Sequence, residues 1–104
     1  MEIRSTHGEG TARLEIHGEL DLGTAPKLDA AVERALQDGC SEVVLDLAGT
    51  TFMDSSGLSA LIRAARAVDA RRGTMAVVSP PGSEARVVIE MSRTGSAVGL
   101  RDAR

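Results

Sequence analysis

The apolar residues of this chain switch repeatedly between the spacing of a strand and the spacing of a helix. Over residues 13–20, apolar and small side chains alternate strictly with charged ones, which predicts a strand with one face in solvent. Residues 28–36 then carry apolar side chains at helical spacing, after Thr24 as a candidate N-cap and Pro26 in the first turn, and before Gly39. This switching constrains the fold more than any single residue does.

The change from strand to helix occurs twice more along the sequence. Strands are predicted over residues 42–47 and 75–78, and the apolar stripe of a second helix runs from residue 58 to residue 68 between them. A short strand over residues 3–5, a short helix around residues 87–91 and a fifth short strand over residues 97–100 complete the prediction. The first of these strands is expected to pair antiparallel with residues 13–20.

Alternation of this kind favours parallel strands, and right-handed crossovers that all step in one direction place the helices on one face of the sheet. A chain of 104 residues, 42% of them hydrophobic, has room for one modest core. We therefore expect a single α/β domain over residues 1–104. Its sheet is predicted to be mixed but mostly parallel, with about four to five strands and the helices mainly on one face.

Composition argues against several classes of function. A formal net charge of −3 gives no general attraction to nucleic acid, and Phe52 is the single aromatic residue, so stacking platforms for bases are lacking. Apolar runs are too short for a membrane span, and no signal peptide follows Met1. Cys40 is the only cysteine, and His7 and His17 are isolated. We expect a cytoplasmic protein that needs no metal or cofactor, binds no nucleic acid directly and does not enter the membrane.

Asp54, Ser55 and Ser56 stand in a row where an extended stretch gives way to the second predicted helix. This turn falls at the carboxyl edge of the predicted sheet, where open α/β folds usually carry ligand sites. Helix capping is the commonest reason for such residues, but capping alone needs only one of them. A phosphate on an exposed hydroxyl here would be held by the start of the helix. Phosphorylation is therefore the functional hypothesis, and capping is the structural alternative.

No catalytic constellation accompanies the serines. The sequence has no GxSxG turn, and neither histidine is near the serine pair along the chain. The stretch GEGTAR lacks the third glycine of a dinucleotide-binding fingerprint, and no lysine-containing phosphate loop is present. We therefore expect no enzymatic activity, and nucleotide binding at this edge has no support in the sequence.

Four short stretches, in order, carry a resemblance to a known family. GELD at residues 18–21, VVLDL at 43–47, FMDSSGL at 52–58 and EMS at 90–92 together resemble the STAS domains of bacterial anti-sigma factor antagonists. The resemblance covers nearly the whole chain. It implies a partner switch, in which the unmodified antagonist binds an anti-sigma factor that is also a serine kinase, and so releases a sigma factor. A PP2C-type phosphatase would reset the switch.

The resemblance also implies which residues act. The phosphorylated residue of the family is the second serine of the pair, which corresponds to Ser56, with Ser55 as the second choice. The surface around it would contact the partner. The residues expected there are Asp21, Asp54, Ser55, Gly57, Ser59, Arg63 and Arg66. Each has a structural alternative: the aspartates suit loops and caps, Gly57 eases the start of a helix, and exposed arginines often only solvate one.

One departure and two alternatives accompany the resemblance. Members of the family commonly continue into a C-terminal helix that is missing after GLRDAR, so residues 92–104 are expected to be loosely ordered. A non-switching STAS subunit of a transporter or signalling complex would use the same surface permanently. A small-molecule or nucleotide sensor would bind its ligand at the same edge.

Overall fold

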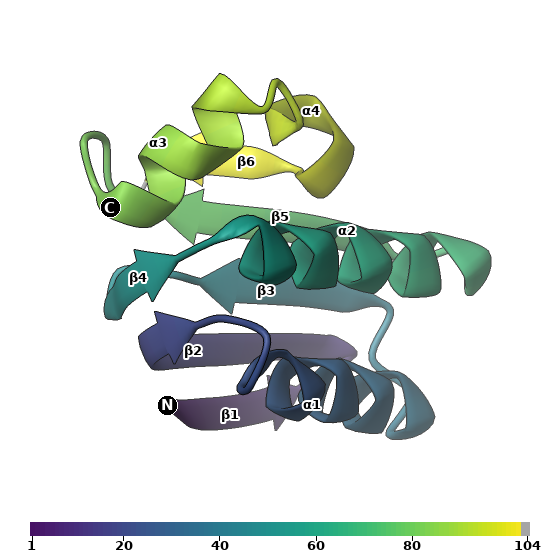
Figure 1. Cartoon of the computed structure of the whole chain (residues 1–104). Coiled ribbons are helices and arrows are strands. Elements are labelled where there is room, and N and C mark those ends of the chain that lie inside the picture. Colours follow the sequence, from purple (N-terminus) through teal and green to yellow (C-terminus); the bar gives the residue numbers. More distant parts are fainter. Residues whose placement is uncertain (103–104) are drawn as a thin grey trace.

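The structure, a computed structural model, describes residues 1–102, which contain six strands and four helices (Figure 1). In chain order the elements are β1 (Glu2–Gly8), β2 (Thr11–Leu20), α1 (Ala25–Gln37), β3 (Glu42–Asp46), β4 (Thr50–Met53), α2 (Ser55–Ala70), β5 (Thr74–Ser79), α3 (Glu84–Met91), α4 (Gly95–Val98) and β6 (Leu100–Asp102). The predicted α/β class is confirmed, with more strands than the four to five expected.

The sheet has the order β1-β2-β3-β5-β6, and β4 pairs with β2 beyond the end of β3. Only β1 runs antiparallel to its neighbour, with Ile3 opposite Ile16, whereas Leu14 of β2 lies opposite Leu45 of β3 in a parallel pair. Leu45 in turn lies opposite Val77 of β5. The predicted mixed, mostly parallel sheet is therefore confirmed.

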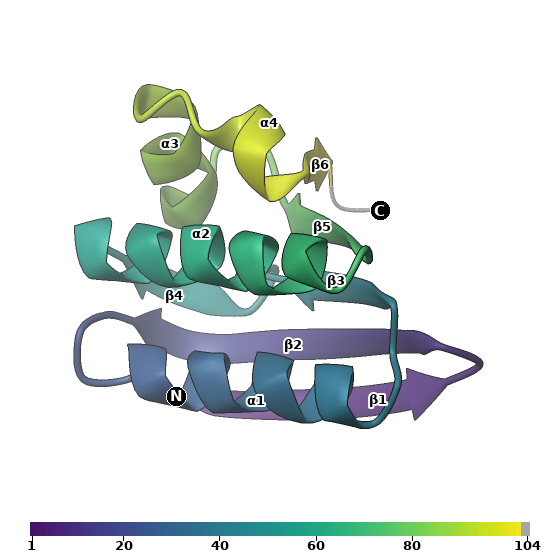
Figure 2. The same ribbon diagram turned by 90° about the vertical axis from the view of Figure 1, so that its right-hand side faces the viewer.

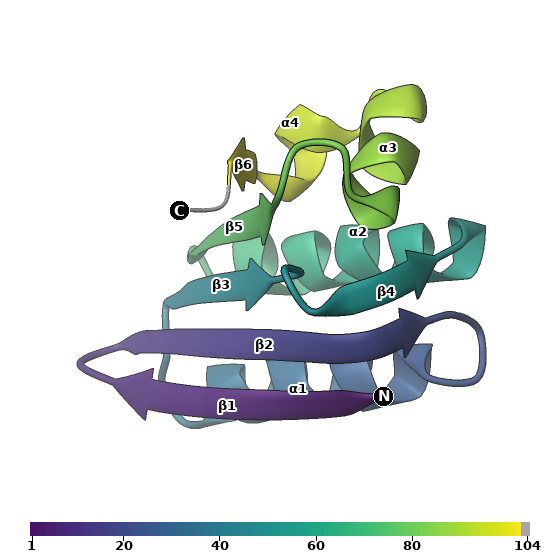
Figure 3. The ribbon, with the colours of Figure 1, turned by 90° about the vertical axis from the view of Figure 1, so that its left-hand side faces the viewer.

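The helices cover one face of this sheet, as the views from two sides show (Figures 2 and 3). The core fills the space between them: Leu14 and Leu45 from the sheet, and Leu28 of α1 and Leu61 of α2, are fully buried. Burying a leucine side chain stabilises the fold by roughly 1.5–3 kcal/mol relative to leaving it exposed. The opposite face of the sheet is left uncovered, and there Arg13 of β2 forms an ion pair with Asp46 of β3.

Two strands differ from the prediction. Strand β4 was not predicted, because only two of its four residues, Thr50 and Met53, are buried and the run is too short to show an alternating pattern. The expected strand over residues 97–100 is wrong in position. Residues Gly95–Val98 instead form α4, which ends at Gly99 in the left-handed conformation (φ 73°), and the strand follows at Leu100–Asp102.

The C-terminal segment is more regular than expected. Of the residues predicted to be loosely ordered, 95–98 form α4 and 100–102 form β6, which pairs with β5 in parallel. Val98 is buried in the core, so a side chain of α4 fixes this segment to the rest of the domain. Residues 103–104 lie outside the described part of the chain.

Candidate functional site

The carboxyl edge of the sheet brings together the end of β2, the end of β4 and the start of α2 (Figure 1). Asp54 is the N-cap of α2, and its backbone is extended there (φ −111°, ψ −170°). Its Oδ1 atom accepts hydrogen bonds from the backbone N–H groups of Ser56, at 2.9 Å, and Gly57, at 3.1 Å. The predicted turn is therefore correctly placed, but the aspartate supplies the cap and both serines lie inside the helix.

The two serine residues differ in exposure. Ser55 is exposed, whereas Ser56 is half-buried. Within residues 1–102, neither hydroxyl has a hydrogen-bond partner. A helix cap uses its side-chain oxygen to accept a backbone N–H, so capping does not account for these two hydroxyls. In the part of the chain that the structure describes, neither hydroxyl is therefore engaged in a hydrogen bond, and no general base is bonded to either one.

Gly57 is buried at the contact between the first turn of α2 and the end of β2. A methyl group at this position would overlap the carbonyl oxygen of Leu20 and would lie 2.6 Å from Cγ of Met53. The glycine is thus required by packing, since nothing larger allows the helix to approach the strand this closely. The structural role expected for Gly57 was only an easier helix start, and close packing is a stronger reason.

The loop after β2 is held by its own hydrogen bonds. Asp21 accepts the backbone N–H of Thr24 through Oδ1 at 3.1 Å, and its own N–H donates to the Thr24 hydroxyl at 2.9 Å. The carbonyl oxygen of Leu20 lies against Gly57, so the residue before Asp21 contacts the first turn of α2. The carboxylate of Asp21 is partly buried in the loop, so its visible role is structural.

Leu22, in the same loop, was missed by the sequence prediction. Its side chain is 76% exposed, although leucine is usually buried. The sequence does contain a signal, because Leu22 is an apolar residue between Asp21 and Gly23 in a segment with turn composition. Leu22 lies two residues after Leu20, whose carbonyl oxygen is close to Gly57, so its exposed side chain belongs to the loop that follows this contact.

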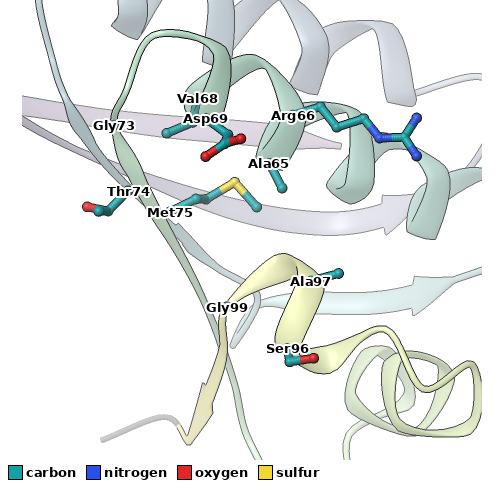
Figure 4. Close-up of a pocket in the computed structure, with 10 residues that line it drawn as sticks. All are labelled: Ala65, Arg66, Val68, Asp69, Gly73, Thr74, Met75, Ser96, Ala97 and Gly99. Carbon is teal, nitrogen blue, oxygen red and sulfur yellow. The ribbon is translucent and has the colours of Figure 1, made fainter.

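The remaining predicted contact residues lie further along α2. Ser59 is exposed one turn after Ser55. Arg63 is directed to α1, where Nη2 lies 3.2 Å from Oδ2 of Asp29, with both side chains about half exposed. Arg66 instead lines an open pocket of about 370 Å³ between α2, β5 and α4 (Figure 4). The two arginines therefore lie on different flanks of the helix, and only Arg63 is held by an ion pair that involves α1.

This pocket lies away from the serine turn. Its lining includes Val68 and Asp69 near the end of α2, Met75 near the start of β5 and Ser96 of α4, and none of the residues 54–59 (Figure 4). Within residues 1–102, no group of three or more His, Cys, Asp or Glu side chains could hold a metal ion. In the same part of the chain, no helix is long and apolar enough to cross a membrane.

The protein is a small α/β domain with helices on one face of its sheet, and within residues 1–102 its candidate site is a surface at the carboxyl edge with two serine hydroxyls that form no hydrogen bond. The sequence model of the STAS domain family matches residues 2–97, so the chain belongs to the STAS domain family. The predicted family is thereby confirmed.

Two curated relatives have names that describe a function. The chain is 33% identical over 84 residues to an anti-sigma F factor antagonist of Paenibacillus polymyxa, covering 78% of this chain and 72% of the relative. It is 28% identical over 69 residues to an anti-sigma-B factor antagonist of Staphylococcus aureus, covering 66% of this chain and 64% of the relative. The resemblance stated from four motifs therefore extends over most of the chain.

Solved structures show the same fold. The anti-sigma factor antagonist SpoIIAA in its unphosphorylated form superposes with a TM-score of 0.81 at 23% identity, covering 99% of this chain and 89% of that one. The Bacillus cell fate determinant SpoIIAA in its phosphorylated form gives a TM-score of 0.76, also at 23% identity, with 99% and 92% covered. At this identity the likeness concerns the fold.

Proposed function

We propose that this protein is an anti-sigma factor antagonist whose binding is switched off by phosphorylation of Ser56. The unphosphorylated form binds an anti-sigma factor that is also a serine kinase, and a sigma factor is released. The observation that carries the proposal is the free hydroxyl of Ser56 on the first turn of α2, in a chain that is 33% identical to an anti-sigma F factor antagonist.

Ser56 is proposed rather than Ser55 because of the family pattern, in which the second serine is modified. Exposure alone favours Ser55, since Ser56 is half-buried. In the proposed step, the Ser56 Oγ forms a bond to the γ-phosphorus of ATP, ADP leaves, and the hydroxyl proton is lost. A PP2C-type phosphatase then hydrolyses the ester, which returns the serine and inorganic phosphate.

The proposed contact surface surrounds this turn. Ser55 and Ser59 are exposed on α2, and Leu22 is exposed in the loop after β2. Asp54 caps α2, and Asp21 forms a hydrogen bond within that loop. Arg63 continues the surface along α2 on the side of α1, whereas Arg66 extends it toward α4. Protein contact surfaces commonly combine apolar and polar side chains in this way.

Phosphorylation would weaken such a contact through charge. The phosphate adds about −1.5 to −2 charges beside Asp54, in a surface that has to lose its water on binding. A buried interfacial charge without its partner commonly costs roughly 2–5 kcal/mol, which corresponds to a fall in affinity of about 30- to 1,000-fold or more. Because regulators of this kind act on transcription, the proposed place of action is the cytoplasm.

The proposal is tested with candidate anti-sigma kinases from the same genome. Wild type, Ser55→Ala and Ser56→Ala are incubated with each kinase and ATP, and the site is located by intact and peptide mass spectrometry. Phosphate on Ser56 that is absent from Ser56→Ala and retained by Ser55→Ala is the expected result. Binding without phosphate transfer from any kinase would contradict the switch and would favour a constitutive subunit.

A further inference from the structure

The N-terminus of α2 already carries a negative charge in this structure. Oδ1 of Asp54 accepts the backbone N–H groups of Ser56 and Gly57, at 2.9 and 3.1 Å. The backbone carbonyl of Asp54 accepts a third N–H group, that of Leu58, at 3.0 Å. These donors belong to the first turn, where a helix is best able to hold an anion. The sequence analysis predicts that this turn would hold the phosphate. The Asp54 carboxylate, however, already accepts hydrogen bonds from two of the N–H groups that the phosphate would need.

The Asp54 carboxylate is held in position by the packing around it. Asp54 is half-buried, and Gly57, one of its two donors, is packed against the carbonyl oxygen of Leu20, so the first turn cannot shift without losing that contact. The Ser56 hydroxyl has no hydrogen bond of its own within residues 1–102, so no contact holds it in one direction. A phosphate on it would be repelled by the Asp54 carboxylate and would find the N–H groups of Ser56 and Gly57 occupied.

We propose that Asp54 is a positioning residue that denies the start of α2 to a phosphate on Ser56, so that the phosphate projects from the surface with its full charge. This inference rests on the proposed function for the identity of the modified serine. It adds the reason why phosphorylation acts on the partner: the charge is neither neutralised by the helix nor used to stabilise the fold.

The test installs phosphoserine at position 56 during translation, so that neither kinase nor partner is needed. Wild type, Asp54→Asn and Asp54→Ala are each prepared with serine and with phosphoserine, and the melting temperatures are compared within each pair. Phosphorylation is expected to lower the melting temperature of wild type. It is expected to raise that of Asp54→Ala by about 2–6 °C, because the phosphate then takes the vacant N–H groups.

Two controls separate this role from helix capping in general. Ser83→Ala removes the N-cap of α3, whose Oγ accepts the N–H of Arg86 at 3.2 Å, and phosphorylation is expected to lower its melting temperature as it does in wild type. Asp54→Asn keeps an oxygen acceptor without the charge. Phosphorylation is therefore expected to lower its melting temperature by less than in wild type, but not to raise it. If Asp54→Ala does not fold, the comparison of Asp54→Asn with wild type still tests the role of the Asp54 charge.

A second measurement reads the hydrogen bonds directly. The amide proton shifts of Ser56 and Gly57 are expected to change little when wild type is phosphorylated, since Asp54 keeps both donors. Large downfield shifts of these amides in wild type, or a rise in its melting temperature on phosphorylation, would overturn the inference. Absence of kinase activity toward Ser56 would contradict the proposed function but would leave this result unaffected.

Discussion

The carbonyl oxygen of Leu20, the last residue of β2, lies against Gly57 in the first turn of α2. Residues 37 positions apart in the sequence thereby come into contact at the edge of the sheet where the serine pair lies. The contact allows a loop and a helix end to form one surface, because no side chain separates them. The candidate site therefore depends on a residue that has no side chain.

Gly57→Ala is expected to destabilise the domain by about 1–3 kcal/mol, since a methyl group has no room between Leu20 and Met53. Chemical denaturation of the two proteins measures this difference. Gly8→Ala is the matched control, because nothing lies within 4 Å of an added methyl group at that position. If Gly57→Ala lowers the free energy of unfolding no more than Gly8→Ala does, the close contact does not restrict the size of the residue at position 57.

Leu22→Ser is expected to weaken binding to the anti-sigma factor at least about tenfold while leaving the melting temperature unchanged, because the side chain is already 76% exposed. Isothermal titration calorimetry and a thermal melt give the two values. Met91→Ser is the control, since Met91 is 80% exposed on α3. Equal binding by wild type and Leu22→Ser would remove Leu22 from the proposed surface.

Arg63→Ala is expected to change the free energy of unfolding by no more than about 1 kcal/mol, because its ion pair with Asp29 is about half exposed on both sides. Affinity for the anti-sigma factor should fall if Arg63 belongs to the contact surface. Asp29→Ala removes the same ion pair but leaves the arginine, so it separates loss of the pair from loss of the contact. If both variants bind the anti-sigma factor as tightly as wild type does, Arg63 is not part of the contact surface.

Much of the fold could be predicted because apolar spacing reports burial directly. The stripe from Leu58 to Val68 and the alternation around Leu14 each correspond to an element that packs on the core. Strand β4 escaped prediction because it has only four residues, and its pairing with β2 depends on a register shift between Gly18 and Glu19 that no local pattern encodes.

The candidate site could be predicted in position but not in detail. Its motif located the turn, yet the sequence could not show that the Asp54 carboxylate uses the N–H groups of Ser56 and Gly57. Nor could spacing distinguish Arg63, which reaches α1, from Arg66, which lines the pocket toward α4. The directions of the two arginines depend on which elements pack beside α2, and this is decided by tertiary contacts. The cap is local, but three adjacent residues of the motif could each have supplied it.

The most direct test compares the affinity of the cognate anti-sigma factor for three forms of this protein: unmodified, Ser56→Ala and phosphorylated at Ser56. The account predicts that the first two bind equally and that the affinity of the third is lower by about 30- to 1,000-fold or more, with the fold unchanged by circular dichroism. Equal affinity of the unmodified and phosphorylated forms would contradict the proposed switch.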